Sequence, residues 1–255
     1  MPILALAAIF LLVALIYSSV GFGGGSSYNA LLVLAGADFQ VIPAISLSCN
    51  IIVVSGGVYH FRKAGLLDMK ALLPFVALSV PMAWFGGQLQ IAESVFLSLL
   101  GLALLVTGVQ LIWSGFHHAV RKESLVLNPW LVGLPLGGVI GLLSGIVGIG
   151  GGIFLAPVLY LTAWAEPRRI AAMASGFILL NSVAGLIGHL MKQGDYSVSS
   201  AWLASWPLFV AVLAGGQIGS RLGIRMLPDA LIRGLTGLLV LYVATRLLWR
   251  WAGLY

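Results

Sequence analysis

Charge-free apolar segments recur along the whole chain and are separated by short polar loops. An α-helix needs about 20 apolar residues to cross the hydrocarbon core of a bilayer, which is about 30 Å thick. Eight segments reach roughly this length, which predicts an all-α polytopic membrane protein. The predicted full spans are Pro2 to Val20, Val41 to Tyr59, Ala71 to Leu89, Val95 to Phe116, Leu131 to Val147, Ile170 to Leu190, Ala201 to Gly219 and Gly234 to Arg250.

Two further apolar stretches, Ser26 to Ala37 and Ile153 to Ala165, are too short to span a membrane. At 1.5 Å per residue, about a dozen residues cover only about 18 Å. Each stretch follows a glycine run, Gly21 to Gly25 in one case and Gly148 to Gly152 in the other. The pattern predicts two helices broken at membrane depth, which is tolerated only where protein or a watery cavity satisfies the free backbone groups. We therefore expect a binding site at the breaks.

The chain repeats itself beyond the glycine runs. Gly148 follows Gly21 by 127 residues, and several identical residues then recur at a spacing of 129, which requires one small insertion. The recurring residues are His60 and His189, Lys63 and Lys192, Gly65 and Gly194, and the triplets Gly86-Gly87-Gln88 and Gly215-Gly216-Gln217. We expect one membrane domain over 1–255, composed of repeat 1 (1–116), a linker (117–130) and repeat 2 (131–255).

The distribution of Lys and Arg predicts the orientation of the repeats. If each glycine-broken segment folds back as a hairpin, ten of the 13 basic residues share one face; if it crosses once, the split is eight to five. The ten residues are Arg62, Lys63, Lys70, Arg121, Lys122, Arg168, Arg169, Arg221, Arg225 and Arg233. Because cytoplasmic loops are rich in Lys and Arg, the hairpin arrangement is favoured, with a cytoplasmic linker and both termini periplasmic. The halves are then inverted repeats, each a hairpin followed by three transmembrane helices.

The composition agrees with a membrane protein and excludes other classes. The chain has 60% hydrophobic and only 8% charged residues, whereas about a quarter of the residues of a soluble domain are charged. The net charge of +6 comes from short loops beside apolar spans, so it reflects membrane orientation and gives no support to nucleic acid as a partner. The single cysteine, Cys49, excludes a disulfide framework. The first apolar segment lacks the positive start of a signal peptide, so we expect it to be retained as a span.

Neutral groups must hold any polar ligand, because no Asp, Glu, Lys or Arg lies well inside a predicted span. Each short helix begins directly after the glycines, so its free N–H groups and positive dipole end point at the break. Two such N-termini meeting near the midplane would form an anion site without formal charge. The candidate substrate-binding residues are Ser19, Gly23, Gly24, Gly25, Ser26, Ser27, Asn50, Gln88, Ser144, Gly150, Gly151, Gly152, Asn181 and Gln217.

These candidates also have purely structural explanations. Glycine runs let helices pack closely in membranes, although the duplication and the half-length helices favour a binding site. For Asn50 and Asn181, an interhelical hydrogen bond explains the residue as well as substrate contact does.

His60 and His189 are the ionisable side chains nearest the span interiors, and each precedes a lysine, Lys63 or Lys192, by three residues. Their titration range suits proton coupling or gating. Their position at span ends favours the alternative, a capping or loop-anchoring role.

The sequence gives little support to an enzyme. Ser144 and His189 are present, but Ser144 has no nucleophile-elbow context. The adjacent His117 and His118 lie in the linker without further ligands, which is a weak metal signal. We expect no cofactor and no metal, and we expect the lipid bilayer and a small anionic substrate as the partners.

Taken together, three features resemble the TauE/SafE sulfite exporter family. These are the duplicated Gly-x-Gly-Gly-Gly that opens a short apolar segment, the basic loop that starts at His60 (His-Phe-Arg-Lys-Ala-Gly), and the Gly-Gly-Gln triplets. The resemblance covers nearly the whole chain. It implies a permease of the bacterial cytoplasmic membrane that exports sulfite or a small organosulfonate.

Three functions are consistent with the sequence. The leading hypothesis is an anion exporter that works by alternating access, with the anion at the two glycine breaks. The second is a passive, channel-like pore for anions or small solutes built on the same hairpins. The third is a membrane scaffold without transport.

Overall fold

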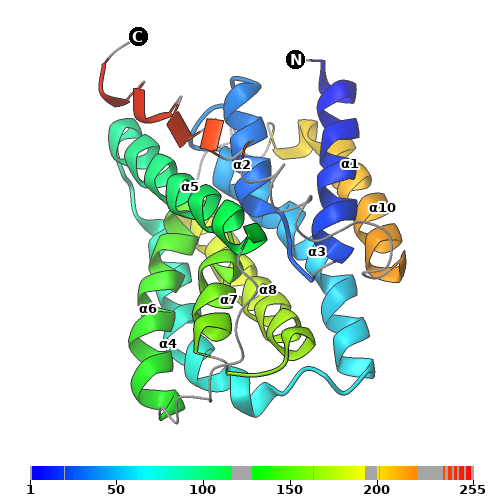
Figure 1. The fold of residues 1–255 in the computed structure, drawn as a ribbon. Helices are drawn as coiled ribbons and strands as arrows, with labels where there is room; N and C mark the ends of the chain where they lie inside the picture. Colours follow the sequence, from blue (N-terminus) through cyan, green and yellow to red (C-terminus); the bar gives the residue numbers. More distant parts are fainter. Residues whose placement is uncertain are drawn as a thin grey trace.

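The computed structural model describes residues 2–19, 21–116, 128–162, 164–192, 200 and 202–222, with isolated residues between 238 and 253. Within these residues every regular element is a helix, as predicted (Figure 1). The helices are α1 (Ile3–Ser19), α2 (Gly25–Leu34), α3 (Ile42–Lys63), α4 (Met69–Gln88), α5 (Glu93–Phe116), α6 (Pro129–Val147), α7 (Gly152–Leu161), α8 (Pro167–Lys192) and α10 (Trp206–Leu222).

Seven of these helices coincide with predicted spans. By length and composition, the stretches Ile42–Lys63, Met69–Gln88, Pro129–Val147 and Arg168–Met191 are long and apolar enough to cross a membrane. Two others, Ile3–Ser19 and Glu93–Val106, are apolar but shorter. The predicted span Gly234 to Arg250 and most of the predicted linker lie largely outside the described residues.

Both glycine runs break the chain into helical pairs, as predicted. In Figure 1, α1 leads away from the end of the molecule that carries the N-terminus, and α2 returns toward that end. α6 and α7 form the corresponding pair in the opposite half of the picture. α2 and α7 have ten residues each, so each is only about 15 Å long.

The fourth helix of each half packs on the other half. α4 makes its most extensive contact with α6, and α10 makes its most extensive contact with α1. Small residues allow both contacts, since glycine lets helix backbones approach closely in membranes. The glycines of α6 that face α4 recur every four residues, at Gly133, Gly137, Gly141 and Gly145.

The backbones in these two contacts touch directly. A Cβ added at Gly137 or Gly145 would collide with a carbonyl oxygen of α4, that of Phe75 or Ala83. On α10, a Cβ at Gly215 would collide with the Leu11 carbonyl oxygen of α1. The Gly-Gly-Gln triplets begin in these contact faces, so their glycines serve helix packing.

The helices form two groups with separate hydrophobic cores. We call α1, α2, α3 and α10 the first bundle, and α4, α6, α7 and α8 the second bundle. One core lies mainly in the first bundle, around Phe10, Tyr28 and Cys49; the other lies in the second, around Phe75 and Phe177. The bundles meet mainly along α3 and α8, which are the most buried of the long apolar helices.

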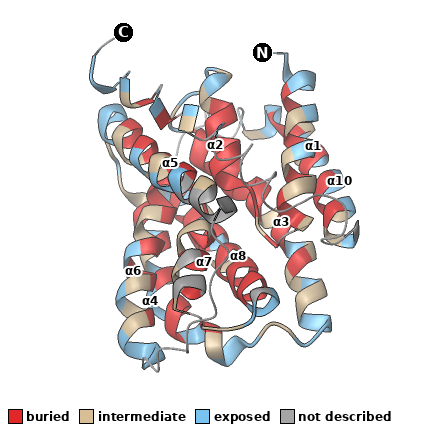
Figure 2. Cartoon of the chain, in the orientation of Figure 1, coloured by how far each residue is buried: buried red, intermediate tan, exposed pale blue. Residues whose placement is uncertain are grey.

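The outer surface is apolar where lipid would lie. Figure 2 shows buried residues concentrated on α2, α3 and α8, with exposed residues along the outer sides of α4 and α6. Large exposed hydrophobic side chains on these outer sides include Leu73, Phe85, Leu131 and Val139. Such a surface suits hydrocarbon, because a soluble protein rarely exposes contiguous apolar patches of this kind.

Candidate functional site

The structure brings the two glycine runs into contact. A Cβ placed on Gly25 would lie 2.6 Å from the Ile149 carbonyl oxygen, so the start of α2 lies directly against the second run. Asn50 of α3 joins them, because its Nδ2 donates a hydrogen bond of 3.0 Å to that same oxygen. Asn50 is fully buried and also abuts Gly23 and Gly150.

Further hydrogen bonds cross between the two halves at the breaks. Asn29 Nδ2 donates to the Val147 carbonyl oxygen at 2.8 Å. In the opposite direction, the Ser175 hydroxyl of α8 donates to the Gly21 carbonyl oxygen. Buried amide and hydroxyl groups of each half thus satisfy carbonyl groups that a broken helix exposes in the other half.

Glycine is required at the breaks for its conformation as well as for space. Gly24 caps α2 at φ 88° and Gly148 ends α6 at φ 78°, both in the left-handed region that other residues adopt at a cost. α2 has no side-chain cap at its first turn. The first N–H groups of α2 therefore remain available beside the second glycine run.

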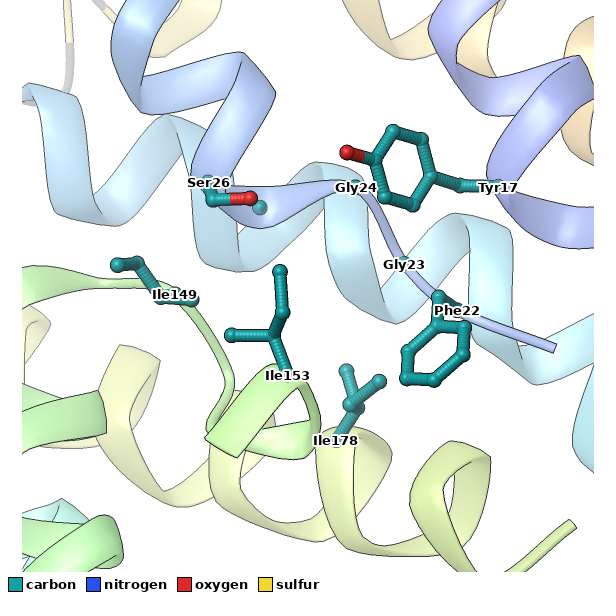
Figure 3. A pocket seen from close by; sticks show the side chains of 9 residues that line it. Tyr17, Phe22, Gly23, Gly24, Ser26, Ile149, Ile153 and Ile178 are labelled. Carbon is teal, nitrogen blue, oxygen red and sulfur yellow. The ribbon is translucent and has the colours of Figure 1, made fainter. Parts of the chain in front are cut away.

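A narrow pocket lies between the first glycine run and apolar side chains of the second half (Figure 3). Its lining residues are Tyr17, Phe22, Gly23, Gly24, Gly25, Ser26, Ile149, Ile153 and Ile178. The cavity is about 10 Å³, which is the space that a single water molecule needs. A polyatomic anion does not fit, so the pocket is closed in this conformation.

Several fully or nearly buried polar atoms around the breaks have no hydrogen-bond partner. Buried polar groups are partnered in the great majority of cases, so a cluster of exceptions indicates a missing ligand or water. The atoms of this cluster are Ser26 Oγ, Tyr28 OH, Asn29 Oδ1, Asn50 Oδ1, Ser144 Oγ and Ser182 Oγ. Ser26, which lines the pocket, is 1% exposed.

The second glycine run shares this cluster. A Cβ on Gly150 would lie 2.9 Å from both Ser182 Oγ and Asn50 Nδ2. A Cβ on Gly151 would lie 3.4 Å from the Ser144 Cβ. The structure therefore gathers Gly23, Gly24, Gly25, Ser26, Asn50, Ser144, Gly150, Gly151 and Gly152 of the predicted site around the two breaks.

Three other predicted site residues already have hydrogen-bond partners within the protein. Asn181 Oδ1 accepts from Ser79 of α4 at 2.6 Å, and its Nδ2 donates to the Phe177 carbonyl, which is the interhelical alternative considered for this residue. Ser19 donates to the Ile16 carbonyl of its own helix. Ser27 pairs with the Tyr17 hydroxyl at 3.0 Å.

The glutamines lie at the ends of their helices. Gln88 is the last residue of α4, and its Nε2 is buried without a partner. Gln217 of α10 lies against Gly56 of α3, where a Cβ would be 3.2 Å from its Nε2. Gln217 thus belongs to a helix contact between the halves, and neither glutamine is among the residues that line the pocket.

The two equivalent histidines have different surroundings. His60 lies in the last turn of α3, half-buried, with its ring 5.6 Å from that of Tyr59. His189 near the end of α8 is 4% exposed, and its Nε2 lies 2.7 Å from the Gly145 carbonyl oxygen of α6. Lys63 ends α3 as an exposed residue, and the Lys192 side chain is outside the described part. The roles of these four residues stay a prediction.

Sequence reasoning missed Tyr17, Tyr28 and Ser175. Ser175 carried a usable signal, because it follows Ser46 by the repeat spacing of 129, and Ser46 donates to the Gly25 carbonyl oxygen at 3.1 Å. Both serines thus donate to carbonyl groups of the first glycine run, from α3 in one case and from α8 in the other. The tyrosines carried no such signal, since aromatic residues are common in membrane helices.

Comparison with known proteins identifies the family of this chain. Residues 6–247 match the family described as Sulfite exporter TauE/SafE. The chain is 34% identical to the probable membrane transporter protein y4hK of Sinorhizobium fredii, over 96% of this chain and 98% of that protein. It is 25% identical to the probable membrane transporter protein MJ0441 of Methanocaldococcus jannaschii, over 84% of this chain and 82% of that protein.

A third relative is the probable membrane transporter protein YunE of Bacillus subtilis, which is 21% identical over 91% of this chain and 92% of its own length. No solved structure matches the chain. The family match extends over nearly all of the residues, including both glycine runs. The chain is therefore a membrane transporter protein of the TauE/SafE sulfite exporter family.

Proposed function

We propose that this protein exports sulfite or a small organosulfonate from the bacterial cytoplasm by alternating access, with the anion held at the two glycine breaks. The observation that carries the proposal is Ser26. Its buried hydroxyl lines the pocket without a partner, in the first turn of a helix whose N-terminus has no side-chain cap. Hydroxyl and backbone N–H donors at a positive dipole end are suited to an oxyanion.

The proposed architecture is a pair of inverted repeats in the inner membrane, with both termini periplasmic. Equivalent contacts support the pairing of the halves. A Cβ on Gly21 would meet Ala171 at 3.2 Å near the start of α8, and a Cβ on Gly148 would meet Pro43 at 2.5 Å near the start of α3. Such paired contacts are expected when a two-fold axis in the membrane plane relates the halves.

The proposed movement is a displacement of the first bundle against the second. The bundles meet mainly along α3 and α8, and the hydrogen bonds from Asn29, Asn50 and Ser175 join the first half of the chain to the second. The closed pocket must widen to admit an anion, and separating the bundles on one side would widen it. Rocking of two units about a central site is a common form of alternating access.

We expect sulfite efflux from proteoliposomes to increase with an inside-negative potential. The potential favours anion exit by about 2.3 kcal/mol per charge per 100 mV, so no carboxylate relay is needed when net charge moves. The measurement is release of preloaded sulfite at imposed potentials. Saturation and counterflow identify a carrier, whereas flux linear in concentration identifies a pore. Voltage-independent efflux contradicts the uniport version, and absence of flux contradicts the function.

We expect Ser26→Ala to weaken sulfite binding by about tenfold without lowering stability, since one hydrogen bond is worth about 0.5–1.5 kcal/mol. Removing an unpartnered buried hydroxyl costs no hydrogen bond in the closed state. The control is Ser48→Ala, because Ser48 already donates to the Ala44 carbonyl and accepts from Trp202. The concentration for half-maximal efflux and the thermal midpoint are measured for both. Equal effects of the two variants on efflux would contradict the assignment of Ser26.

A further inference from the structure

Asn50 carries an unpartnered acceptor whose identity the hydrogen bonding fixes. Its amide nitrogen must face the Ile149 carbonyl, because two oxygens cannot share that hydrogen bond of 3.0 Å. The other amide atom is therefore the oxygen Oδ1. Oδ1 is buried and has no partner.

This acceptor borders the wall of the pocket. Added Cβ atoms at Gly23 and Gly25 would collide with the Asn50 amide, and both glycines line the pocket. Ser26, the next residue, supplies a donor in the same wall. Asn50 is not itself a lining residue and lies directly behind these glycines. Once the closed pocket widens, the site therefore offers hydroxyl and backbone donors together with one side-chain carbonyl acceptor, and this acceptor disfavours a fully deprotonated oxyanion.

The absence of charged side chains in the lining also disfavours a fully deprotonated oxyanion. None of the nine residues that line the pocket carries a formal charge. The Born cost of moving an ion into a medium of low dielectric grows with the square of its charge, so a dianion costs roughly four times as much as a monoanion here. No positive side chain of the lining offsets that cost.

We infer that the transported form is a monoanion that carries a hydrogen atom, hydrogen sulfite, and that Asn50 Oδ1 accepts its hydroxyl hydrogen while Ser26 and the start of α2 bind its other oxygens. This inference rests on the proposed function and specifies its substrate. Asn50 is then a residue that determines specificity, in addition to holding the second glycine run.

Titration of the substrate, and not of the protein, sets the pH dependence in this scheme. The titratable groups on the elements around the break are Tyr17, Tyr28 and Cys49, which are neutral near pH 7. On α8, His189 lies against the Gly145 carbonyl, and His60 lies at the far end of α3. Arg221 lies in the last turn of α10 and is exposed.

The first experiment measures the charge that moves with each sulfur atom. In proteoliposomes with equal pH on both sides and a tenfold sulfite gradient, the potential that stops net flux is about 59 mV for one charge and about 30 mV for two. We expect about 59 mV. A value near 30 mV overturns the inference and leaves export intact, whereas no sulfite flux at all overturns the proposed function.

A second measurement uses pH. At constant total sulfite and alkaline pH, we expect flux to fall about tenfold per pH unit, as hydrogen sulfite is depleted. Flux of methanesulfonate, a monoanion without an ionisable hydrogen, stays constant over the same range. If the pH dependence of sulfite flux disappears in His60→Gln or His189→Gln, a histidine of the protein titrates and not the substrate. That result would overturn the inference.

The third experiment tests Asn50 directly. Asn50→Leu removes the acceptor, so the ratio of sulfite flux to methanesulfonate flux should fall by about tenfold. Asn29→Leu is the matched control, because Asn29 also donates to a carbonyl of the second half and has an unpartnered Oδ1. It should lower both fluxes in parallel. An unchanged ratio in Asn50→Leu, or the same change in both variants, overturns the assignment.

Discussion

Gly25→Ala lowers sulfite efflux by at least about tenfold, although it adds only one methyl group. Gly25 has an ordinary helical φ, so alanine introduces no backbone strain. The new Cβ would lie 2.5 Å from Asn50 Nδ2 and 2.6 Å from the Ile149 carbonyl oxygen. It therefore forces the two glycine runs apart at the point where they meet. Efflux from proteoliposomes, normalised to the amount of folded protein, measures the effect.

The control for this variant is Gly57→Ala on α3. A Cβ at Gly57 would find its nearest neighbour, Ser175 Oγ, at an ordinary 3.8 Å. Efflux should stay near that of the unmodified protein, with stability unchanged or slightly raised, because alanine favours a helix over glycine by up to about 1 kcal/mol. If Gly25→Ala transports as well as Gly57→Ala, the site does not lie at the contact between the glycine runs.

Gly141→Ala destabilises the fold by about 1–3 kcal/mol, a typical cost of overpacking. The added Cβ would collide with the Ser79 carbonyl of α4 and would lie 2.7 Å from the Ser79 Cα. Backbone atoms cannot rotate away as a side chain can, so α4 and α6 must separate. The change also disturbs the Ser79 hydroxyl, which donates to Asn181.

The thermal midpoint in detergent, followed by tryptophan fluorescence, checks this result. Gly57→Ala is again the matched control, because both substitutions replace a glycine inside a helix and only one meets backbone. Equal midpoints for the two variants would show that the contact between α4 and α6 tolerates extra volume. For the variants Ser26→Ala and Gly25→Ala, an unchanged thermal midpoint shows that a loss of efflux does not come from a folding defect.

The sequence predicted the helices and the two breaks because their signals are local. Apolar length identifies a membrane helix, and the glycine runs with a short apolar segment behind them mark α2 and α7. It also placed Ser26 and Asn50 among the candidate binding residues, because no charged side chain lies well inside a predicted span and neutral polar groups must hold a ligand. The family resemblance led to the same family that the comparison identifies.

Partners that come from distant parts of the chain could not be predicted. Asn50 and Asn181 looked equally suited to substrate contact or hydrogen bonding, and only packing separates them: Asn181 meets Ser79, and Asn50 meets both breaks. The packing of α4 against α6 could not be predicted from the sequence either. The glycines that permit it mark a close approach but do not name the helix that approaches.

α4 and α10 each pack mainly against a helix of the other half, and this has a consequence for how the protein is assembled. The main packing partner of α4 is α6, and the main packing partner of α1 is α10. In both cases the partner is synthesised later than the helix that it covers. Neither half can complete its packing alone, so the first half emerges into the membrane with its glycine-contacting faces still uncovered. The main contacts of α1 and α4 can therefore form only after α10 and α6 have been synthesised.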